Sequence, residues 1–315
     1  MLNLGEKLGR IIIPLATPFT DDDRQEVNHE AAARLVDHCI TRGYCDSLIV
    51  AGTSGEFNAM SLEERLELFK TVQAACRGRV PLVGGACSDA TREAIALARA
   101  AEELGFDAVM ALGPCYCKPT QEGVYRHFAA IAEAVSLPIM LYNIPIFTGL
   151  NVEKETVARL AERYPHIVGI KDEAGINPTQ MTEFARVTPP GFTVYNGDDI
   201  MVLCGLAQGA AGVVSGGSII IGAQMREMID RFLAGNVAGA LEIHNALDPL
   251  FKAFGSNGRV NPIPLWKAAM NLCGLEVGPP RLPLAPATNE EVEIIRIQLK
   301  RLEVLYESNR EVSKN

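Results

Sequence analysis

The chain has 315 residues, of which 48% are hydrophobic and 21% are charged, and its formal net charge is -9. This composition is typical of a globular protein with enough length for one large domain. The acidic balance argues against a general binder of nucleic acids or anionic membranes. The sequence contains no apolar stretch of membrane-spanning length, and residues 1–10 lack the apolar core of a signal peptide.

The eight cysteines are scattered along the chain. The only close pair, Cys115 and Cys117, lacks the C-x-x-C spacing of zinc and redox motifs and has no companion pair. We interpret all eight as reduced thiols, and we therefore expect a cytoplasmic protein.

Short apolar runs alternate with helical patterns up to residue 222. The runs predict strands because they are bounded by glycine, proline and polar turn residues. Several are continuous rather than alternating, which is typical of parallel strands covered on both faces. Eight such runs occur, at residues 11–18, 47–51, 80–84, 108–112, 137–142, 167–171, 192–195 and 211–215.

Helical patterns lie between these runs. A helix begins at Asn28 and is expected to end at Gly43, a residue that commonly terminates helices. Ser61 and Glu64 have the spacing of a capping box, which predicts a helix from there to about Arg77. Further helices are expected at residues 88–104, 121–135, 152–163 and 179–186, with a short one before the last run.

Eight strand-then-helix units predict an α/β protein with a (β/α)8 TIM barrel. A doubly wound open sheet is the alternative, but no G-x-G-x-x-G motif follows any of the runs. Beyond Gly222 only helices are expected, at residues 224–233, 237–254, 264–273 and 289–306. We therefore divide the chain into a barrel that carries the active site, 1–222, and a C-terminal helical appendage, 223–315.

Active sites of such barrels lie at the carboxyl ends of the strands, so we consider the residues there. Lys171 ends the sixth run. A lysine desolvated at a barrel mouth exposes a nucleophilic amine, which forms Schiff bases with carbonyl substrates. The alternative is a strand-end lysine that reaches water.

Other polar side chains follow neighbouring strands. Tyr142 ends the fifth run, and its phenol could relay protons to or from a Schiff base. The alternative is that Tyr142 is a packing residue, as tyrosines at strand ends commonly are. Tyr116 lies in the loop after the fourth run. Thr53 and Ser54 lie in a glycine-bounded turn after the second run, which suits a carboxylate, although such turns also simply begin helices.

Metal and phosphate sites have weaker support. None of the five histidines ends a predicted strand. Asp198 and Asp199 could bind a cation, but paired acids after a strand more often cap the next helix. The turn at residues 215–218 could hold an anion. We expect no metal and no cofactor.

With these residues in place, nearly the whole chain resembles the dihydrodipicolinate synthase / N-acetylneuraminate lyase family. These are class I, pyruvate-handling lyases on a (β/α)8 barrel with C-terminal helices. The motifs that carry the resemblance are G-T-S-G-E at 52–56, the Tyr116 loop with Q-E-G at 121–123, Y-N-I-P at 142–145, G-I-K-D at 169–172 and N-P-I-P at 261–264.

The resemblance implies a role for each matched residue. Lys171 would form the Schiff base, and Tyr142 would handle protons. Thr53 and Ser54 would bind the carboxylate of the keto acid, and Thr53 would also join the proton relay. Val214 matches a position whose backbone carbonyl lines the substrate site.

The resemblance also implies an assembly. Tyr116 would complete the relay in a neighbouring subunit, so a homotetramer built as a dimer of dimers is expected. The partners would be pyruvate or another 2-oxo acid plus an aldehyde, with no nucleic acid and no membrane.

Two positions depart from the synthases of this family. Their arginine two residues after Y-N-x-P, which holds the carboxylate of the second substrate, is replaced here by Phe147. A phenyl ring cannot pair with a carboxylate, and losing a charged hydrogen bond costs roughly 1.5–3 kcal/mol of binding. Cys115 and Cys117 flank Tyr116 where the synthases commonly have a double tyrosine.

These features give three hypotheses. The first is a Schiff-base aldolase or lyase that makes or breaks a C–C bond between pyruvate and an aldehyde, for which Phe147 helps to set specificity. The second is the 4-hydroxy-tetrahydrodipicolinate synthase, which condenses pyruvate with aspartate semialdehyde in lysine biosynthesis. A dehydratase that uses the same imine is a further alternative, weighed beside the third hypothesis. The third is a barrel that binds a keto acid without turnover.

Overall fold

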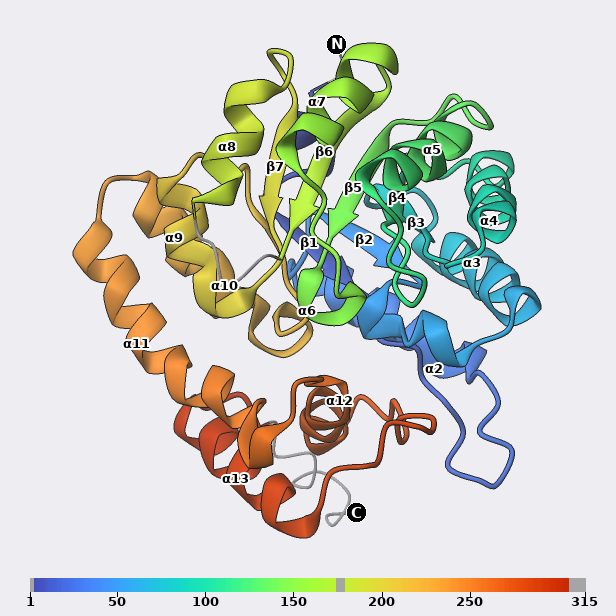
Figure 1. Ribbon diagram of the computed structural model, residues 1–315. Helices are drawn as coiled ribbons and strands as arrows, with labels where there is room; N and C mark the ends of the chain where they lie inside the picture. Colours follow the sequence, from blue (N-terminus) through green and yellow to red (C-terminus); the bar gives the residue numbers. More distant parts are fainter. Residues whose placement is uncertain (1–2, 174–178, 306–315) are drawn as a thin grey trace, which may run out of the picture.

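The computed structural model describes residues 3–173 and 179–305. Eight parallel strands pair in sequence order and close into a barrel, which confirms the TIM-barrel prediction and excludes the open sheet (Figure 1). The strands are β1 (Ile11–Pro14), β2 (Ser47–Val50), β3 (Leu82–Ala86), β4 (Ala108–Leu112), β5 (Ile139–Asn143), β6 (Ile167–Asp172), β7 (Thr193–Asn196) and β8 (Val213–Val214).

Helices surround the barrel, and the last three gather on the side toward which the arrows of β5, β6 and β7 point (Figure 1). The helices are α1 (Leu4–Leu8), α2 (His29–Thr41), α3 (Leu62–Cys76), α4 (Thr91–Glu103), α5 (Gln121–Ala132), α6 (Pro145–Thr148), α7 (Lys154–Arg163), α8 (Gln180–Val187), α9 (Val202–Ala207), α10 (Ser218–Leu233), α11 (Val237–Ala253), α12 (Ile263–Leu272) and α13 (Asn289–Arg301).

For most helices and strands, the bounds predicted from the sequence lie within a few residues of the observed bounds. Ser61 and Glu64 form both hydrogen bonds of the expected capping box at the start of α3. β3 begins two residues later than predicted, because Pro81 has no N–H to donate to a strand ladder. The short helices α1 and α6 were missed, since a single turn carries no periodic pattern.

Side chains of the strands alternate between an inner and an outer core. Ile12 of β1 and Ile49 of β2 belong to the core inside the barrel, whereas their neighbours Ile13 and Leu48 pack outward. This alternation follows from the two-residue period of a strand. Because the strands are buried on both faces, their sequences read as continuous apolar runs.

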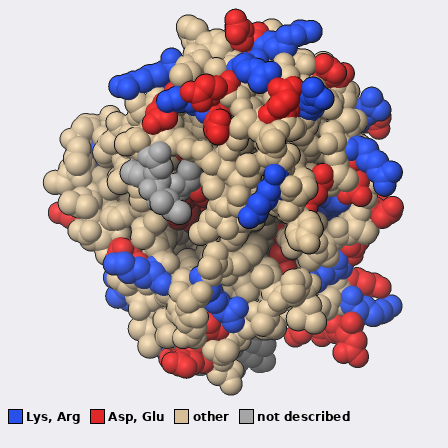
Figure 2. Space-filling model, in the orientation of Figure 1, with Lys and Arg blue, Asp and Glu red and all other residues tan. Residues whose placement is uncertain are grey.

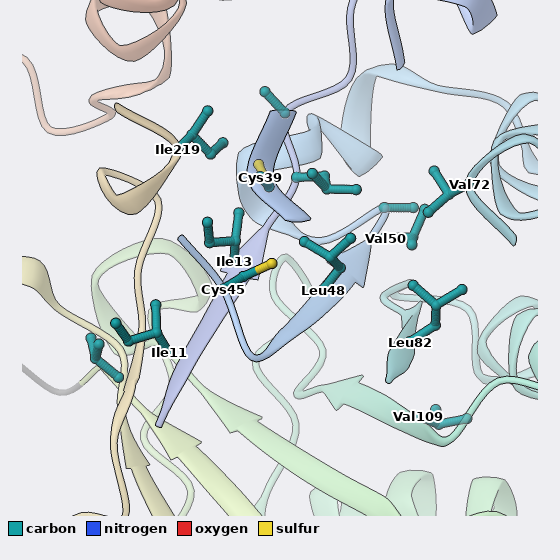
Figure 3. Close-up of a cluster of buried hydrophobic side chains, with 14 of the residues drawn as sticks. Ile11, Ile13, Cys39, Cys45, Leu48, Val50, Val72, Leu82, Val109 and Ile219 are labelled. Atoms are coloured by element: carbon teal, nitrogen blue, oxygen red, sulfur yellow. The ribbon is translucent and has the colours of Figure 1, made fainter. Parts of the chain in front are cut away.

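The outer core fills the layer between strands and helices. Figure 3 shows the part where β1 and β2 meet Cys39 of α2, Val72 of α3 and Ile219 of α10. Leu4 and Leu8 of α1 belong instead to the inner core and are fully buried. The barrel interior is therefore packed with side chains.

The expected boundary between residues 222 and 223 falls inside α10, which runs from Ser218 to Leu233 and bends at Ile221. This helix packs on β1 as well as on α11. We therefore propose that the barrel extends through α10 and that the C-terminal helical region begins after it. The last predicted helix ends at Arg301, and its expected end at residue 306 lies outside the described residues.

Within the described ranges, no helix is both long and apolar enough to cross a membrane. On the face shown in Figure 2, lysine and arginine side chains are interspersed with aspartate and glutamate. Neither sign of charge dominates that face.

A buried ion pair joins the C-terminal region to the barrel. Lys267 of α12 and Glu56, which follows the turn after β2, are 1% and 0% exposed, with Nζ and Oε1 2.6 Å apart. The backbone N–H of Arg281 donates to the other oxygen of Glu56 at 2.9 Å. Burial lowers the pKa of the Lys267 ammonium to about 8. Glu56 thus fixes the Thr53–Ser54 turn through contacts distant in sequence.

We predict that Lys267→Met destabilises the protein by about 3–5 kcal/mol, because it leaves the buried Glu56 carboxylate without a charged partner. Thermal and urea unfolding measure the loss. Glu56→Gln combined with Lys267→Met should recover most of it. Lys252→Met removes an exposed lysine of α11 as the control, with an effect below about 0.5 kcal/mol. Equal effects of Lys267→Met and Lys252→Met would contradict the role of the buried pair.

Candidate active site

A cavity of about 630 Å³ lies where the strands end, between the barrel and helices α11 and α12. Most of the residues predicted for the site line it together: Thr53, Ser54, Tyr142, Phe147, Lys171 and Val214. The C-terminal region adds Phe251, Phe254, Arg259, Ile263 and Trp266, which no strand-end argument could supply. The cavity is therefore shaped by both parts of the chain.

Lys171 and Tyr142 are neighbours because β5 and β6 pair in parallel with these two residues in register. Both are buried, at 5% and 1% exposure. The Lys171 ammonium lies 4.0 Å from the centre of the Tyr142 ring, within the range of a cation–π contact. Lys171 is thus a desolvated lysine at a strand end, and the alternative in which it reaches water is wrong.

Glu173 was not singled out from the sequence, yet it contacts both of these residues. Its Oε2 atom lies 3.2 Å from Lys171 Nζ and accepts a hydrogen bond from the Tyr142 hydroxyl at 2.8 Å. Burial raises the pKa of the Glu173 carboxyl. A signal was available: Glu173 is two residues after Lys171, and alternate residues of an extended chain face the same side.

The turn after β2 forms a 3-10 helix, η1 (Thr53–Gly55). The Thr53 hydroxyl lies 3.3 Å from the Tyr142 hydroxyl. Ser54 is 5% exposed and lines the cavity next to it. Burial raises the pKa of the Tyr142 phenol well above its usual value, and the nearby charge of Glu173 is the second cause of this rise. Tyr142 is therefore protonated at neutral pH and acts as a donor.

Tyr116 lies apart from these residues. Its side chain is 93% exposed, and it does not line the cavity. The neighbouring Cys115 is held by Asp89, which accepts from the Cys115 backbone N–H at 2.6 Å. The loop thus presents Tyr116 outward, away from the Lys171 site of its own chain.

Asp198 and Asp199 line the cavity with Glu173. Asp198 accepts from the N–H of Ile200 and caps η3 (Asp199–Met201), as expected for such a pair. Asp199 accepts from the N–H of Gly217 at 2.8 Å. Burial raises the pKa of both carboxyls, that of Asp199 to about 6. Several carboxyl groups therefore line the cavity together with Lys171.

Among the described residues that line the cavity, Lys171 and Arg259 are the only cations. Arg259 is committed elsewhere: it pairs with Glu291 at 2.7 Å and donates to the carbonyls of Ala285 and Pro286. It lacks the free guanidinium edge that a substrate carboxylate needs. Phe147, held on α6, supplies no charge in its place.

The alternative ligands considered from the sequence find little support. The described residues contain no group of three or more histidine, cysteine, aspartate and glutamate side chains able to hold a metal ion. In the turn at residues 215–218, the N–H of Gly217 donates to Asp199 and that of Ser218 to Ser215. Both donors are therefore used within the protein and are not free to bind an anionic ligand.

Gly197 makes the approach of Lys171 and Glu173 possible. A Cβ atom at residue 197 would lie 2.7 Å from Lys171 Cε and 2.9 Å from Glu173 Cβ. Both distances are shorter than real Cβ contacts. A side chain here would therefore displace the amine from its partners.

We predict that Gly197→Ala slows imine formation between Lys171 and a 2-oxo acid by roughly tenfold to a hundredfold, because the reacting atoms are misplaced. Trapping with borohydride over a time course measures the rate. Gly113→Ala is the control, since its Cβ would meet nothing closer than 3.7 Å. A normal trapping rate in Gly197→Ala would show that the packing around Lys171 tolerates displacement.

Comparisons with known proteins agree with this geometry. The model of the dihydrodipicolinate synthetase family matches residues 7–302. The 4-hydroxy-tetrahydrodipicolinate synthase of Desulforudis audaxviator is 45% identical over 94% of this chain and 98% of its own. In Halalkalibacterium halodurans, 4-hydroxy-tetrahydrodipicolinate synthase 1 is 46% identical over 90% of this chain and 94% of its own.

Solved structures of this family are also similar to nearly the whole chain. The crystal structure of DHDPS from Cyanidioschyzon merolae with lysine bound has a TM-score of 0.89 and 40% identity, and the match covers 95% of this chain and 99% of that one. The names of these relatives favour the synthase hypothesis, which the sequence placed second, over an aldolase of unspecified acceptor.

Proposed function

We propose that Lys171 is the Schiff-base residue of this chain, which belongs to the dihydrodipicolinate synthetase family. The protein is a pyruvate-dependent class I lyase of that family. The observation that carries the assignment is a buried amine at a strand end, 3.2 Å from a carboxylate and 4.0 Å from a tyrosine ring. The barrel that binds a keto acid without turnover is thereby set aside.

The neighbouring groups would perform the remaining steps. Thr53 and Ser54 would bind the carboxylate of pyruvate, which places its C2 carbonyl against Lys171. The protonated imine formed there stabilises the carbanion at C3, and this carbanion adds to an aldehyde or is released by cleavage. Tyr142 would move the proton, and the backbone carbonyl of Val214 would line the keto-acid site.

Borohydride trapping with pyruvate, followed by peptide mass mapping, tests the assignment. We predict a reduced pyruvate adduct on the peptide that contains Lys171, and its complete loss in Lys171→Ala. The matched control is Lys154→Ala, which removes a half-exposed lysine of α7 and should leave the adduct unchanged. A folded wild-type protein without an adduct would remove the proposed function.

The acceptor side of the cavity favours an aldehyde that is uncharged and hydroxylated. Asp198 and Asp199 present carboxyl groups, which bind hydroxyls well and repel carboxylates. Phe147 adds apolar surface instead of a guanidinium. We therefore infer that the C–C bond made or broken joins pyruvate to an aldehyde without a carboxylate near Phe147, such as one derived from a sugar.

The second candidate is the 4-hydroxy-tetrahydrodipicolinate synthase, favoured by the names of the relatives. This reaction needs a cation for the carboxylate of aspartate semialdehyde. Arg259 is the only described lining residue besides Lys171 with a positive charge, and Glu291 already neutralises it. The lining residues thus offer the carboxylate of this aldehyde no free cation, whereas the names of the relatives support this candidate better than the first.

We predict that Phe147→Arg increases kcat/KM for pyruvate plus aspartate semialdehyde by roughly tenfold to a hundredfold, because a charged hydrogen bond contributes about 1.5–3 kcal/mol. A coupled assay measures turnover. Ile146→Arg is the matched control, because Ile146 also lines the cavity. This substitution adds the same charge one residue away from position 147. High wild-type turnover with this aldehyde would establish the second candidate.

We also propose a homotetramer built as a dimer of dimers, in which exposed Tyr116 meets a neighbouring subunit. An aromatic ring 93% exposed supports a contact of this kind. A cytoplasmic location is proposed from the cysteines, all eight of which are free.

A further inference from the structure

Two residues with left-handed backbone bound the turn that carries Thr53 and Ser54. Ala51 before the turn has φ 54°, and Glu56 after it has φ 55° and ψ 40°. Neither residue is glycine, so each conformation costs free energy and persists only where the surrounding structure holds it. The turn is therefore strained at both ends.

The barrel itself holds the start and the middle of this turn. Ala51 lies against Gly85 of β3, where a Cβ atom would come within 2.4 Å of the Ala51 carbonyl oxygen. The buried Thr17 hydroxyl donates to the Gly55 carbonyl at 2.7 Å. These contacts come from the strands and the loops beside them. They do not involve the side chain of Glu56 at the far end of the turn.

The C-terminal region holds that far end. One oxygen of the Glu56 carboxylate contacts Lys267, and the other accepts from the backbone N–H of Arg281. The Arg281 guanidinium also donates to the Ala59 carbonyl at 3.0 Å and pairs with Glu64 at 2.6 Å. The strained end of the turn is thus fixed by residues that are distant from it in the sequence.

Glu56 is not among the described residues that line the cavity, so it can act there only through the turn. Its N–H donates to the Thr53 carbonyl at 2.9 Å and closes the 3-10 helix η1. The Thr53 hydroxyl lies 3.3 Å from that of Tyr142, and Ser54 lines the cavity. A change of Glu56 to an ordinary backbone conformation would break the hydrogen bond to Thr53 and displace both hydroxyl side chains of the turn.

We propose that Glu56 is a positioning residue for the keto acid, which holds the Thr53–Ser54 turn in the conformation that binds the carboxylate. Because Lys267 and Arg281 fix Glu56, the C-terminal region sets the affinity of the barrel for this substrate. The inference rests on the proposed function, in which Thr53 and Ser54 bind the carboxylate of pyruvate.

The test uses full-length protein and three double variants, in which Lys267→Met is combined with Glu56→Gln, Glu56→Ala or Glu56→Gly. Lys267→Met is included in each so that no buried ammonium is left without its partner. Cyanoborohydride trapping at increasing pyruvate concentration gives the half-saturating concentration and the limiting rate of adduct formation on the Lys171 peptide. Acetone, which has the reacting carbonyl but no carboxylate, is the comparison compound. Lys252→Met, an exposed lysine of α11, is the control.

We expect the variant with Glu56→Ala to raise the half-saturating concentration of pyruvate by roughly tenfold, because hydrogen bonds to a charged carboxylate are misaligned. The limiting rate and the rate with acetone should stay within about threefold of the wild type, since the lost interaction is one of binding. Glu56→Gly should raise the half-saturating concentration by only about threefold, because glycine adopts a positive φ without strain. Glu56→Gln still offers an oxygen to the Arg281 N–H and should stay within about twofold.

The outcomes separate this role from a role in stability alone. A group that only stabilises the fold predicts the same half-saturating concentration in every folded variant, and that result overturns the proposal. Equal losses with pyruvate and acetone also overturn it, because they place the effect at Lys171 instead of at the carboxylate. No pyruvate adduct in the wild type removes the proposed function itself.

If the variant with Glu56→Ala does not fold, Arg281→Lys decides. This substitution keeps the backbone N–H that binds Glu56, but an ammonium cannot donate to Ala59 and pair with Glu64 as the guanidinium does. The half-saturating concentration of pyruvate should rise by roughly threefold, with the rate for acetone unchanged. An unchanged half-saturating concentration in this variant overturns the proposal.

Discussion

The burial of one ammonium group is the constraint on which the site depends. Lys171 is 5% exposed, and a buried charge is tolerated only with partners. Tyr142 and Glu173 provide them, one through the register of β5 and β6 and the other through the two-residue period of the strand. Both depend on closure of the barrel, which fixes the register. The fold therefore provides the electrostatic environment that keeps the amine desolvated.

The residues behind the site stabilise the same register. Asn143 and Asp172 follow Tyr142 and Lys171, so their side chains point to the opposite face of the sheet. There Asn143 donates to Asp172 at 2.9 Å and accepts from the N–H of Val152 at 2.9 Å. Each of the motifs Y-N-I-P and G-I-K-D thus combines one residue that faces the cavity with one that locks the two strands together.

This division explains how much could be predicted. Strand-end reasoning is geometric, so the barrel and the positions of Lys171, Tyr142 and Thr53 followed from short apolar runs and the residues after them. It cannot identify residues that reach the site from distant parts of the sequence. Arg259 and Trp266 reach the cavity from the C-terminal region, and Lys267 fixes Glu56 beneath the turn that holds Thr53. Such contacts depend on how helices pack, which local sequence patterns do not encode.

The residues that identify the family differ from those that we expect to select the aldehyde substrate. The strand-end motifs surround the amine and would serve any reaction that begins with a pyruvate imine. Phe147, Asp198 and Asp199 lie instead on α6 and on the loop after β7, where side chains change without disturbing the barrel. Relatives 45% identical can therefore share the imine chemistry of this chain. The carboxylate of an acceptor aldehyde would meet carboxyl groups and a phenyl ring there, so we expect the choice of aldehyde to depend on these loops more than on the motifs.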